Sequence, residues 1–273
     1  MEPMNGQRTG RRSKVETSGG FKFAKTVLPF CLLIWSFCLA ASHAETAEET
    51  FRKANSAYAA GQFAQAADLY RTARQAGLNH WILDYNLGNA EYKNNQPGKA
   101  IADYSRAFRL NSGNADVVYN LHLVSTRAGD PLVPAGALAA VFWRMYYLFS
   151  LNTLSVIVSI LFLALVARLG GWLLGGARPA SEALAGLLGA LVIAGAWLGS
   201  RAYFAERPEG VIIGGVGEVR SAPNTSSPAN FTVPEGHRVL ILDEQEPVTG
   251  WVEIGVPEQG LKGWVADGSI EKI

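Results

Sequence analysis

Small and aromatic residues recur along residues 45–128 with the spacing of helices that pack in pairs. The stretches "AADLYRTAR" and "AIADYSRAF" each carry Ala, Tyr and Ala at i, i+4 and i+7, which share one face of a helix. Tyr-Asn-Leu occurs at 85–87 and again at 119–121. The same shift matches five further pairs of residues: Ala54 and Gly88, Tyr58 and Tyr92, Ala66 and Ala100, Tyr70 and Tyr104, and Ala73 and Ala107. The pattern predicts one helix–turn–helix unit used repeatedly, with turns at Gly61 and in "NNQPG".

These residues resemble the tetratricopeptide repeat, a helix–turn–helix unit of about 34 residues. "YNLGNAEY" has the Leu-Gly and following aromatic residue of that family, and "KAIADYSRAF" has its second-helix Ala, Tyr and Ala. The resemblance implies two full units and a third that starts at "DVVYNLHLV". Because His122 stands where the family has Gly or Ala and no second helix completes the unit, we expect the third copy to be a single capping helix.

The resemblance also implies a concave groove, formed by the first helix of each unit, that grips a segment of a protein partner. The groove residues expected from family positions are Phe51, Asn55, Tyr58, Tyr85, Asn89, Tyr92 and Lys93. The alternative for each aromatic residue is packing between units. Asn55 and Asn86 fit the versions of the family that hold a peptide's C-terminal carboxylate, but the paired lysines and arginines of that site are missing.

Two long apolar runs follow, at 151–173 and 183–204, each with one charged residue near its end, Arg168 or Arg201. A membrane-spanning helix needs ~20 mostly apolar residues, and an arginine near its end can extend toward the lipid headgroups. No other part of the chain is large enough to cover both runs as a soluble core. They therefore predict a transmembrane hairpin with a juxtamembrane linker at 129–150 and a short loop at 174–182.

Two features of the predicted hairpin suggest how it sits in the membrane. Trp143, Tyr146 and Tyr147 precede the first run, where aromatic residues anchor a span at the outer interface. Gly195 and Gly199 form a pair of small residues that lets another helix approach closely. That helix is either the first span, which we favour, or a helix of another molecule.

From residue 209 to 273 the pattern changes to short runs of β-branched and aromatic residues between turn residues, which predicts a small all-β barrel. "EVRSAPN", "VPEGHRVLILDEQ", "GWVEI" and "KGWVADGSIEKI", in that order, resemble the bacterial SH3-like domain. In that family such barrels bind peptides or cell-wall material, or dock onto neighbouring domains. Trp251 and Trp264 are the candidates for an aromatic ligand surface, and the alternative that we favour is that one or both fill the core.

Residues 1–44 read as an export signal. Six basic residues precede the apolar run "TVLPFCLLIWSFCLAA", and "SHA" offers a cleavage site after Ala44. The alternative is an uncleaved signal anchor, which also leaves the following residues outside the cytoplasm. Because Cys31 and Cys38 both lie in this run, a cleaved product has no cysteine and no disulfide.

Charge and motif content argue against nucleic acid as a partner and against catalysis. The net charge is only +1, and from Pro208 onward ten acidic residues face four basic ones. His80, His122 and His237 are far apart in the sequence, and no zinc-binding spacing, nucleophile motif or phosphate loop occurs. We therefore expect a protein that is not an enzyme and has no cofactor or metal.

Taken together, the predicted fold is a multidomain membrane protein with an all-α tetratricopeptide array (45–128), a transmembrane helical hairpin (151–173 and 183–204) and a small all-β SH3-like barrel (209–273). This order resembles the BatE-like proteins of bacterial aerotolerance operons, as does "YNLGNAEYKNNQPGKAIADYSRAFRLN" followed by "DVVYNL" and "FSLNTLSVIV". The resemblance implies an inner-membrane protein that works beside von Willebrand factor A-type membrane proteins and a MoxR-type ATPase. The export signal implies that both soluble modules face the periplasm.

Two functions from different classes follow from this reading. The first is a non-enzymatic adaptor that organises an envelope-stress or aerotolerance complex through its periplasmic binding modules. The second is a cell-wall binder or sensor in which the barrel holds peptidoglycan. An envelope enzyme is a third hypothesis, and it is disfavoured by the absence of catalytic motifs.

Overall fold

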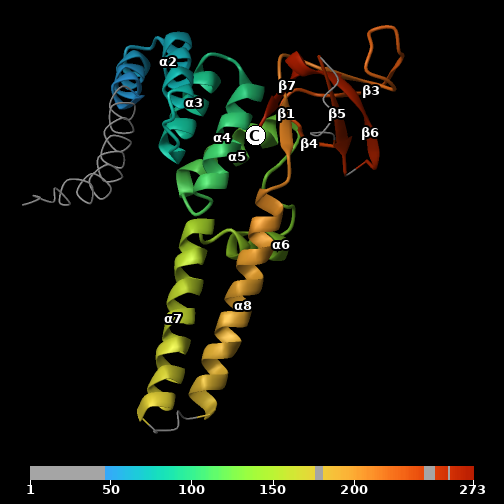
Figure 1. The fold of residues 1–273 in the computed structure, drawn as a ribbon. Coiled ribbons are helices and arrows are strands. Elements are labelled where there is room, and N and C mark those ends of the chain that lie inside the picture. The colour runs from blue at the N-terminus through green and yellow to red at the C-terminus, as the bar shows by residue number, and fades with distance from the viewer. Residues whose placement is uncertain (1–46, 176–180, 243–249, 258) are drawn as a thin grey trace, which may run out of the picture.

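The computed structural model describes residues 47–175, 181–242, 250–257 and 259–273 (Figure 1). The predicted signal at 1–44 lies outside them. Residues 47–59 are helical. The other helices are α2 (Phe63–Gln75), α3 (Trp81–Lys93), α4 (Pro97–Leu110), α5 (Ala115–Ala128), α6 (Ala137–Tyr146), α7 (Leu151–Gly175) and α8 (Ser181–Ala205). The strands are β1 (Glu209–Ile212), β2 (Gly217–Arg220), β3 (Ala229–Val233), β4 (Arg238–Ile241), β5 (Trp251–Val256), β6 (Leu261–Ala266) and β7 (Ile270–Lys272).

Residues 47–128 form an array of antiparallel helices that repeats with the period of the sequence. Phe63 and Pro97 begin α2 and α4, and Trp81 and Ala115 begin α3 and α5, so both pairs are separated by the shift that aligns Tyr-Asn-Leu. Gly88 is small because the Tyr104 ring lies close to its backbone. A Cβ added to Gly88 would lie 2.7 Å from that ring. The predicted recurrence is therefore present in the structure as a stack of helix pairs.

Local sequence signals set the ends of these helices. Pro97 opens α4 at a position where a missing N–H costs nothing. The side chain of Asn114 caps α5 by accepting from the backbone N–H groups of Asp116 and Val117. Gly129 ends α5 in the left-handed conformation that glycine adopts without strain. These signals confine α5 to 14 residues before the chain turns toward α6.

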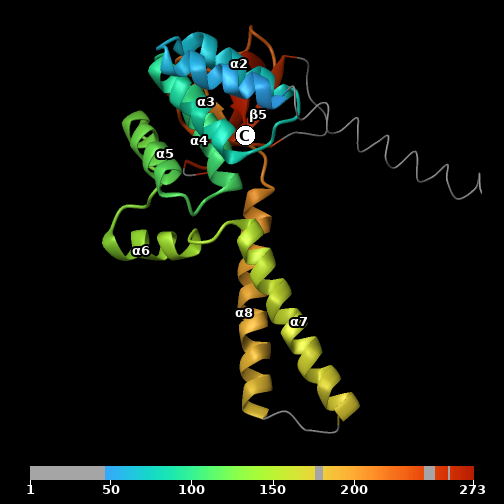
Figure 2. The same cartoon turned by 90° about the vertical axis from the view of Figure 1, so that its left-hand side faces the viewer.

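In the first two units, a second helix runs back against the first. In the described residues of the third unit, no second helix packs in this way against α5. The helix after α5 is α6, which has no buried residue and lies across the direction of α7 and α8 (Figure 2). The place beside α4 is occupied by the C-terminal barrel instead, through contacts of α4 with β1 and β7.

Helices α7 and α8 pack against each other and project away from the array and the barrel (Figure 1). Both are long and apolar enough to cross a membrane. Our favoured expectation for the glycines of α8 is not met, because a Cβ added to Gly195 or Gly199 would have no atom of α7 within 4 Å. The two helices contact each other through other residues, and Leu154, Leu165 and Ala194 are buried.

The C-terminal strands form one antiparallel sheet in the order β3-β2-β6-β5-β4-β1-β7. Alternate residues of β5 and β6 point inward, as the period of two along a strand requires. The core is entirely aliphatic except for the partly buried Phe231 and consists of Ile212, Val219, Val233, Val239, Ile241, Val252, Ile254, Val256, Val265 and Ile270.

The barrel shares a hydrophobic core with the array. Val211 of β1 is fully buried, yet it belongs to the cluster around Ile101 and Leu121 of the array rather than to the barrel core. Backbone approaches closely at the same place, because a Cβ added to Gly98 would lie 2.7 Å from the main-chain oxygen of Ile212. The barrel is thus seated directly on α4.

Ion pairs surround this apolar contact. Arg238 of β4 donates from its backbone N–H and its guanidinium to Asp130, which follows α5, with the shortest distance at 2.8 Å. Arg106 of α4 donates to Glu271 of β7 at 2.7 Å, and Arg109 donates to Glu209 of β1 at 3.2 Å. Paired charges around an apolar centre give one orientation of the barrel an advantage over others.

Substitution of Gly98 by Ala should loosen the barrel while favouring the helix that carries it. Ala is a better helix former than Gly, but the added methyl group would overlap the Ile212 oxygen, and overpacking of this kind costs about 1–3 kcal/mol. Hydrogen exchange of the full-length protein in detergent should show faster exchange in β1 and β7 with helix α4 retained.

Gly268→Ala provides a control, because a Cβ there meets no atom within 4 Å. If exchange is unchanged in Gly98→Ala, the contact between the barrel and α4 is less tightly packed than the structure indicates.

Candidate functional site

The face of the array formed by residues 47–59, α3 and α5 carries a ladder of amide side chains. Tyr70 donates to Asn55 at 2.6 Å, and one unit later Tyr104 donates to Asn89 at 2.7 Å. Asn86 donates to Asn55 at 3.1 Å, and Asn120 donates to Asn89, also at 3.1 Å. Because the hydrogen bonds repeat with the sequence, the first two units hold Asn55 and Asn89 in the same way.

The aromatic groove candidates are only half-buried, and most of them also pack between helices. The ring of Phe51 lies 5.7 Å from that of Tyr70, and the ring of Tyr85 lies 5.9 Å from that of Tyr104. The Tyr58 ring lies 5.3 Å from Phe63. The Tyr92 hydroxyl accepts a hydrogen bond from Arg127 of α5. These aromatic side chains therefore pack between helices and are also partly exposed to solvent. Lys93, at the end of α3, is exposed.

A small pocket of about 70 Å³ brings three of the predicted residues together, since it is lined by Asn55, Tyr58, Tyr70, Asn86 and Asn89. Phe51, Tyr85, Tyr92 and Lys93 do not line it. Burial raises the pKa of the Tyr70 phenol to about 12, and burial also raises that of Tyr58, so both hydroxyls remain protonated hydrogen-bond donors at neutral pH.

The predicted groove omitted two residues of the third unit. Asn120 completes the amide ladder, and Tyr119 is 66% exposed on α5, at the position that Tyr85 occupies on α3. The repeated Tyr-Asn-Leu was the signal that could have identified both. Tyr119 is the groove aromatic with the most area free for a partner.

The barrel presents both predicted tryptophans on its outer face rather than in its core. Trp251 lies opposite Ala266, and Trp264 lies opposite Glu253, so both side chains share the face of the sheet that points away from Val252 and Val265. Each is half-buried. Our favoured alternative, that one or both fill the core, is therefore wrong, because aliphatic residues fill the core. This face belongs to β5 and β6, whereas the array contacts β1 and β7.

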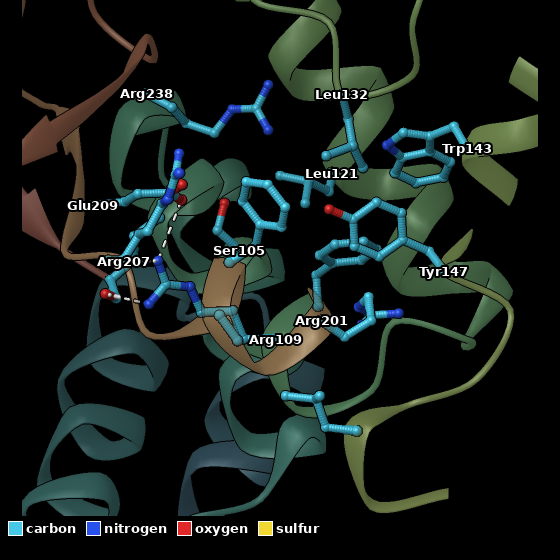
Figure 3. Close-up of a pocket in the computed structure, with 15 residues that line it drawn as sticks. Ser105, Arg109, Leu121, Leu132, Trp143, Tyr147, Arg201, Arg207, Glu209 and Arg238 are labelled. Carbon is cyan, nitrogen blue, oxygen red and sulfur yellow. Dashed lines mark hydrogen bonds and ion pairs between the residues drawn. The ribbon is translucent and has the colours of Figure 1, made fainter. Parts of the chain in front are cut away.

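A third site is a cavity of about 190 Å³ where the array, the end of α8 and the barrel meet (Figure 3). Its basic residues are Arg109, Arg201, Arg207 and Arg238, and its acidic residue is Glu209. Aromatic and aliphatic side chains form the remaining wall, among them Phe108, Trp143, Tyr147, Leu132, Leu151 and Phe204. Sequence reasoning did not find this site, because its residues come from segments that lie far apart in the sequence.

Arg201 makes contacts that the sequence did not predict. It is 5% exposed and donates to the main-chain oxygens of Tyr146 and Phe149 and to the hydroxyl of Ser112, at 3.0–3.1 Å. Its side chain thus joins the end of α8 to the array. The predicted aromatic anchor is also turned inward, since Trp143 and Tyr147 pack on Phe108 of α4.

Charged residues buried between α2, α3 and α4 form a connected network. Arg74 donates to Asp103 at 2.8 Å and to Asp84 at 3.5 Å, and Arg106 joins Asp103 to Glu271 of the barrel. Burial and the charge of Asp103 raise the pKa of the Asp84 carboxyl to about 6, although Arg74 and Arg106 act to lower it. Burial likewise raises the pKa of Asp103, against the opposing charges of Arg106 and Arg74.

Within the described ranges, no group of three His, Cys, Asp or Glu side chains could hold a metal ion. The histidines contribute to local structure: His80 caps α3, and His122 accepts from the backbone N–H of Val133 at 3.4 Å. That the protein is not an enzyme and needs no cofactor stays a prediction.

Comparison with known families identifies the barrel. Residues 214–271 match the family described as Bacterial SH3 domain. The C-terminal antiparallel sheet is consistent with an SH3-like domain, as the order of its strand motifs predicted. A search of curated proteins found no match to the chain. The tetratricopeptide assignment of the helical array and the BatE-like resemblance of the chain stay predictions.

The raised pKa of Asp84 predicts a pH-dependent stability of the array. Because the folded state binds this proton more tightly than the unfolded state, the contribution of Asp84 is fully present below its ordinary pKa of 3.8 and is lost as the pH rises through about 6. The opening free energy of α3, taken relative to an Asp84→Asn variant, should therefore fall between about pH 4 and pH 7, on the order of 1 kcal/mol or more. Hydrogen exchange of α3 amides measures it, and parallel curves for the two proteins would contradict the assignment.

Proposed function

We propose that the protein is a non-enzymatic membrane adaptor whose helical array binds a protein partner. The observation that carries this proposal is the repeated face of Asn55, Asn89 and Asn120 with neighbouring tyrosines. Such a face offers oriented amides for main-chain groups of a bound segment, and tyrosines supply contact area at low cost in side-chain entropy. The period of the array and its helix–turn–helix unit support the assignment to tetratricopeptide repeats.

The membrane placement rests on α6, α7 and α8 together. Both long helices are apolar, and α6 lies across them at the end of the hairpin nearest the array (Figure 2). Its large apolar side chains Leu138, Val141, Phe142 and Met145 are exposed and share one face, and Arg144 is exposed as well. A helix that lies crosswise with an apolar face fits the boundary between headgroups and acyl chains. We therefore place the bilayer surface at α6.

We place the array and the barrel in the periplasm and the 174–182 loop in the cytoplasm of a bacterial inner membrane. The export signal predicted at 1–44 and the bacterial SH3 domain support this orientation. By the BatE-like resemblance, the partners are von Willebrand factor A-type membrane proteins and a MoxR-type ATPase of an aerotolerance or envelope-stress complex.

Tyr119 tests the adaptor function without disturbing the fold. Tagged protein solubilised from native membranes in mild detergent should retain von Willebrand factor A-type proteins, identified by mass spectrometry. Tyr119→Ser should reduce their recovery about tenfold, because loss of an aromatic contact at an interface often costs more than ~1 kcal/mol. Gln65→Ser on α2, exposed outside the groove, is the matched control. Recovery of the protein alone, under conditions that preserve other membrane complexes, would argue against the adaptor.

The outer face of the barrel supports a second candidate function, binding of cell-wall material. Trp251 and Trp264 lie together on a sheet face that the array leaves uncovered, and aromatic side chains there offer a flat apolar surface beside Glu253 and Lys262, which pair at 3.4 Å.

Co-sedimentation with purified sacculi separates the two functions. If the barrel binds wall material, the full-length protein in detergent should pellet with sacculi, and substitution of both Trp251 and Trp264 by Ala should abolish pelleting. The Tyr119→Ser variant should pellet normally. If pelleting persists in the double variant, the tryptophan face does not bind the wall.

A further inference from the structure

The cavity where the array, α8 and the barrel meet (the junction cavity) contains a buried positive charge, Arg201, that no carboxylate of the described residues neutralises. Arg201 is 5% exposed, and its hydrogen bonds go to two main-chain oxygens and one hydroxyl. Its guanidinium also lies 4.4 Å from the centre of the Tyr147 ring. Across the described residues, no carboxylate forms an ion pair with it. A buried ion that lacks a counter-charge is strongly disfavoured, so a nearby anion would stabilise this arrangement.

A second arginine of the cavity is also without a carboxylate partner in the described part of the chain. Arg207 stacks on Phe204, 4.6 Å from the ring centre, and contacts the Tyr203 hydroxyl at 3.5 Å. The other two guanidiniums are occupied, since Arg238 pairs with Asp130 and Arg109 pairs with Glu209. The lining thus has an excess of positive charge from Arg201 and Arg207 (Figure 3).

The size and the walls of the cavity favour a polar group attached to an apolar body. Its volume of about 190 Å³ exceeds what a single water needs, ~10–15 Å³ on the same kind of measure. Arginine is the side chain best suited to phosphate, because its fork of N–H donors matches the phosphate oxygens. Leu151, Phe204 and Trp143 supply apolar parts of the wall.

The location decides the source of the phosphate. Leu151 is the first residue of α7, and Phe204 and Ala205 are the last residues of α8, so the cavity lies at the end of the apolar hairpin. α6 contributes Trp143 to the wall and exposes Phe142. In a membrane placed at α6, this is the depth of lipid headgroups. Basic pockets beside membrane helices bind anionic headgroups.

We propose that the junction cavity binds the phosphate of an anionic phospholipid and that Arg201 and Arg207 hold it. A bound lipid would thereby connect the array, α8 and the barrel, all of which line the cavity. This inference rests on the membrane placement given under the proposed function.

Lipid titration of the full-length protein in phosphate-free detergent solution tests the site. Phosphatidylglycerol should raise the unfolding temperature in a saturable manner, and phosphatidylcholine should have a much smaller effect. Arg207→Gln should weaken the apparent affinity for phosphatidylglycerol roughly tenfold, the loss of one charge-assisted contact. Arg144→Gln, which removes an exposed charge of α6 outside the cavity, should change it little.

A variant that fills the cavity separates a site from general attraction to the surface. Ala205→Phe leaves the charge unchanged but places a ring where Ala205 lines the cavity, so it should also abolish the response to phosphatidylglycerol. An equal response of Arg207→Gln, Ala205→Phe and Arg144→Gln would overturn the proposal. So would an inorganic phosphate titration that reproduces the full phosphatidylglycerol effect, because the site would then serve a soluble anion.

Carbonate extraction of native membranes distinguishes the absence of a lipid site from an error in the membrane placement. Protein that stays in the membrane but does not respond to phosphatidylglycerol would overturn the lipid site alone. Protein released by carbonate would overturn the placement on which the site rests.

Discussion

The burial of Val211 of β1 in the core of the helical array is the contact on which the arrangement of this protein depends. Because its side chain lies with Ile101 and Leu121 rather than with the barrel residues, the first strand of the barrel is part of two cores at once. Separating barrel from array would expose this residue and leave Arg238 and Asp130 without partners. The adjacent charges act in the same direction. Burial, the largest single effect, acts to raise the pKa of Asp130, but the hydrogen bonds and charge of Arg238 together with the charge of His237 lower it overall, so the pair stays charged at neutral pH. The two modules behave as one body that presents two separate surfaces.

The contact of the barrel with α4 also sets the position of the apolar hairpin formed by α7 and α8. Only Glu206, Arg207 and Pro208 separate the end of α8 from β1, so a barrel fixed on α4 fixes the end of α8 as well. Arg201 fixes α8 from the other side, through Ser112 of the array and the chain that follows α6. The hairpin, the array and the barrel therefore meet at one junction with little freedom for relative motion. Binding in the groove and at the tryptophan face would be coupled through a rigid body rather than through a flexible linker.

The sequence predicted the elements well where each is governed by its own pattern. The recurrence of Tyr-Asn-Leu and of Ala-Tyr-Ala located the repeated helices, and β-branched runs between turns located a barrel that matches a known family. Prediction was incomplete where the position of a side chain depends on residues far away in the sequence. The contacts of Arg201 were not predicted, because only its apolar neighbours are visible in sequence, whereas its partners lie 52–89 residues away. Trp251 and Trp264 looked like core residues by type, but their strand register turned them outward.

The groove shows why a repeat pattern locates equivalent residues more readily than it shows whether they serve folding or binding. Asn55 and Asn89 recur because each is held by a tyrosine from the second helix of its own unit, so their recurrence alone is explained by folding. Tyr119 recurs with Tyr85, yet only Tyr85 has a ring from a second helix, Tyr104, against it. Since the third unit lacks that helix, Tyr119 keeps its exposure and is available to another molecule. The third unit is the weakest part of the sequence repeat. Because Tyr119 there has no packing role against a second helix, it is the groove residue whose role in binding is easiest to separate from a role in folding.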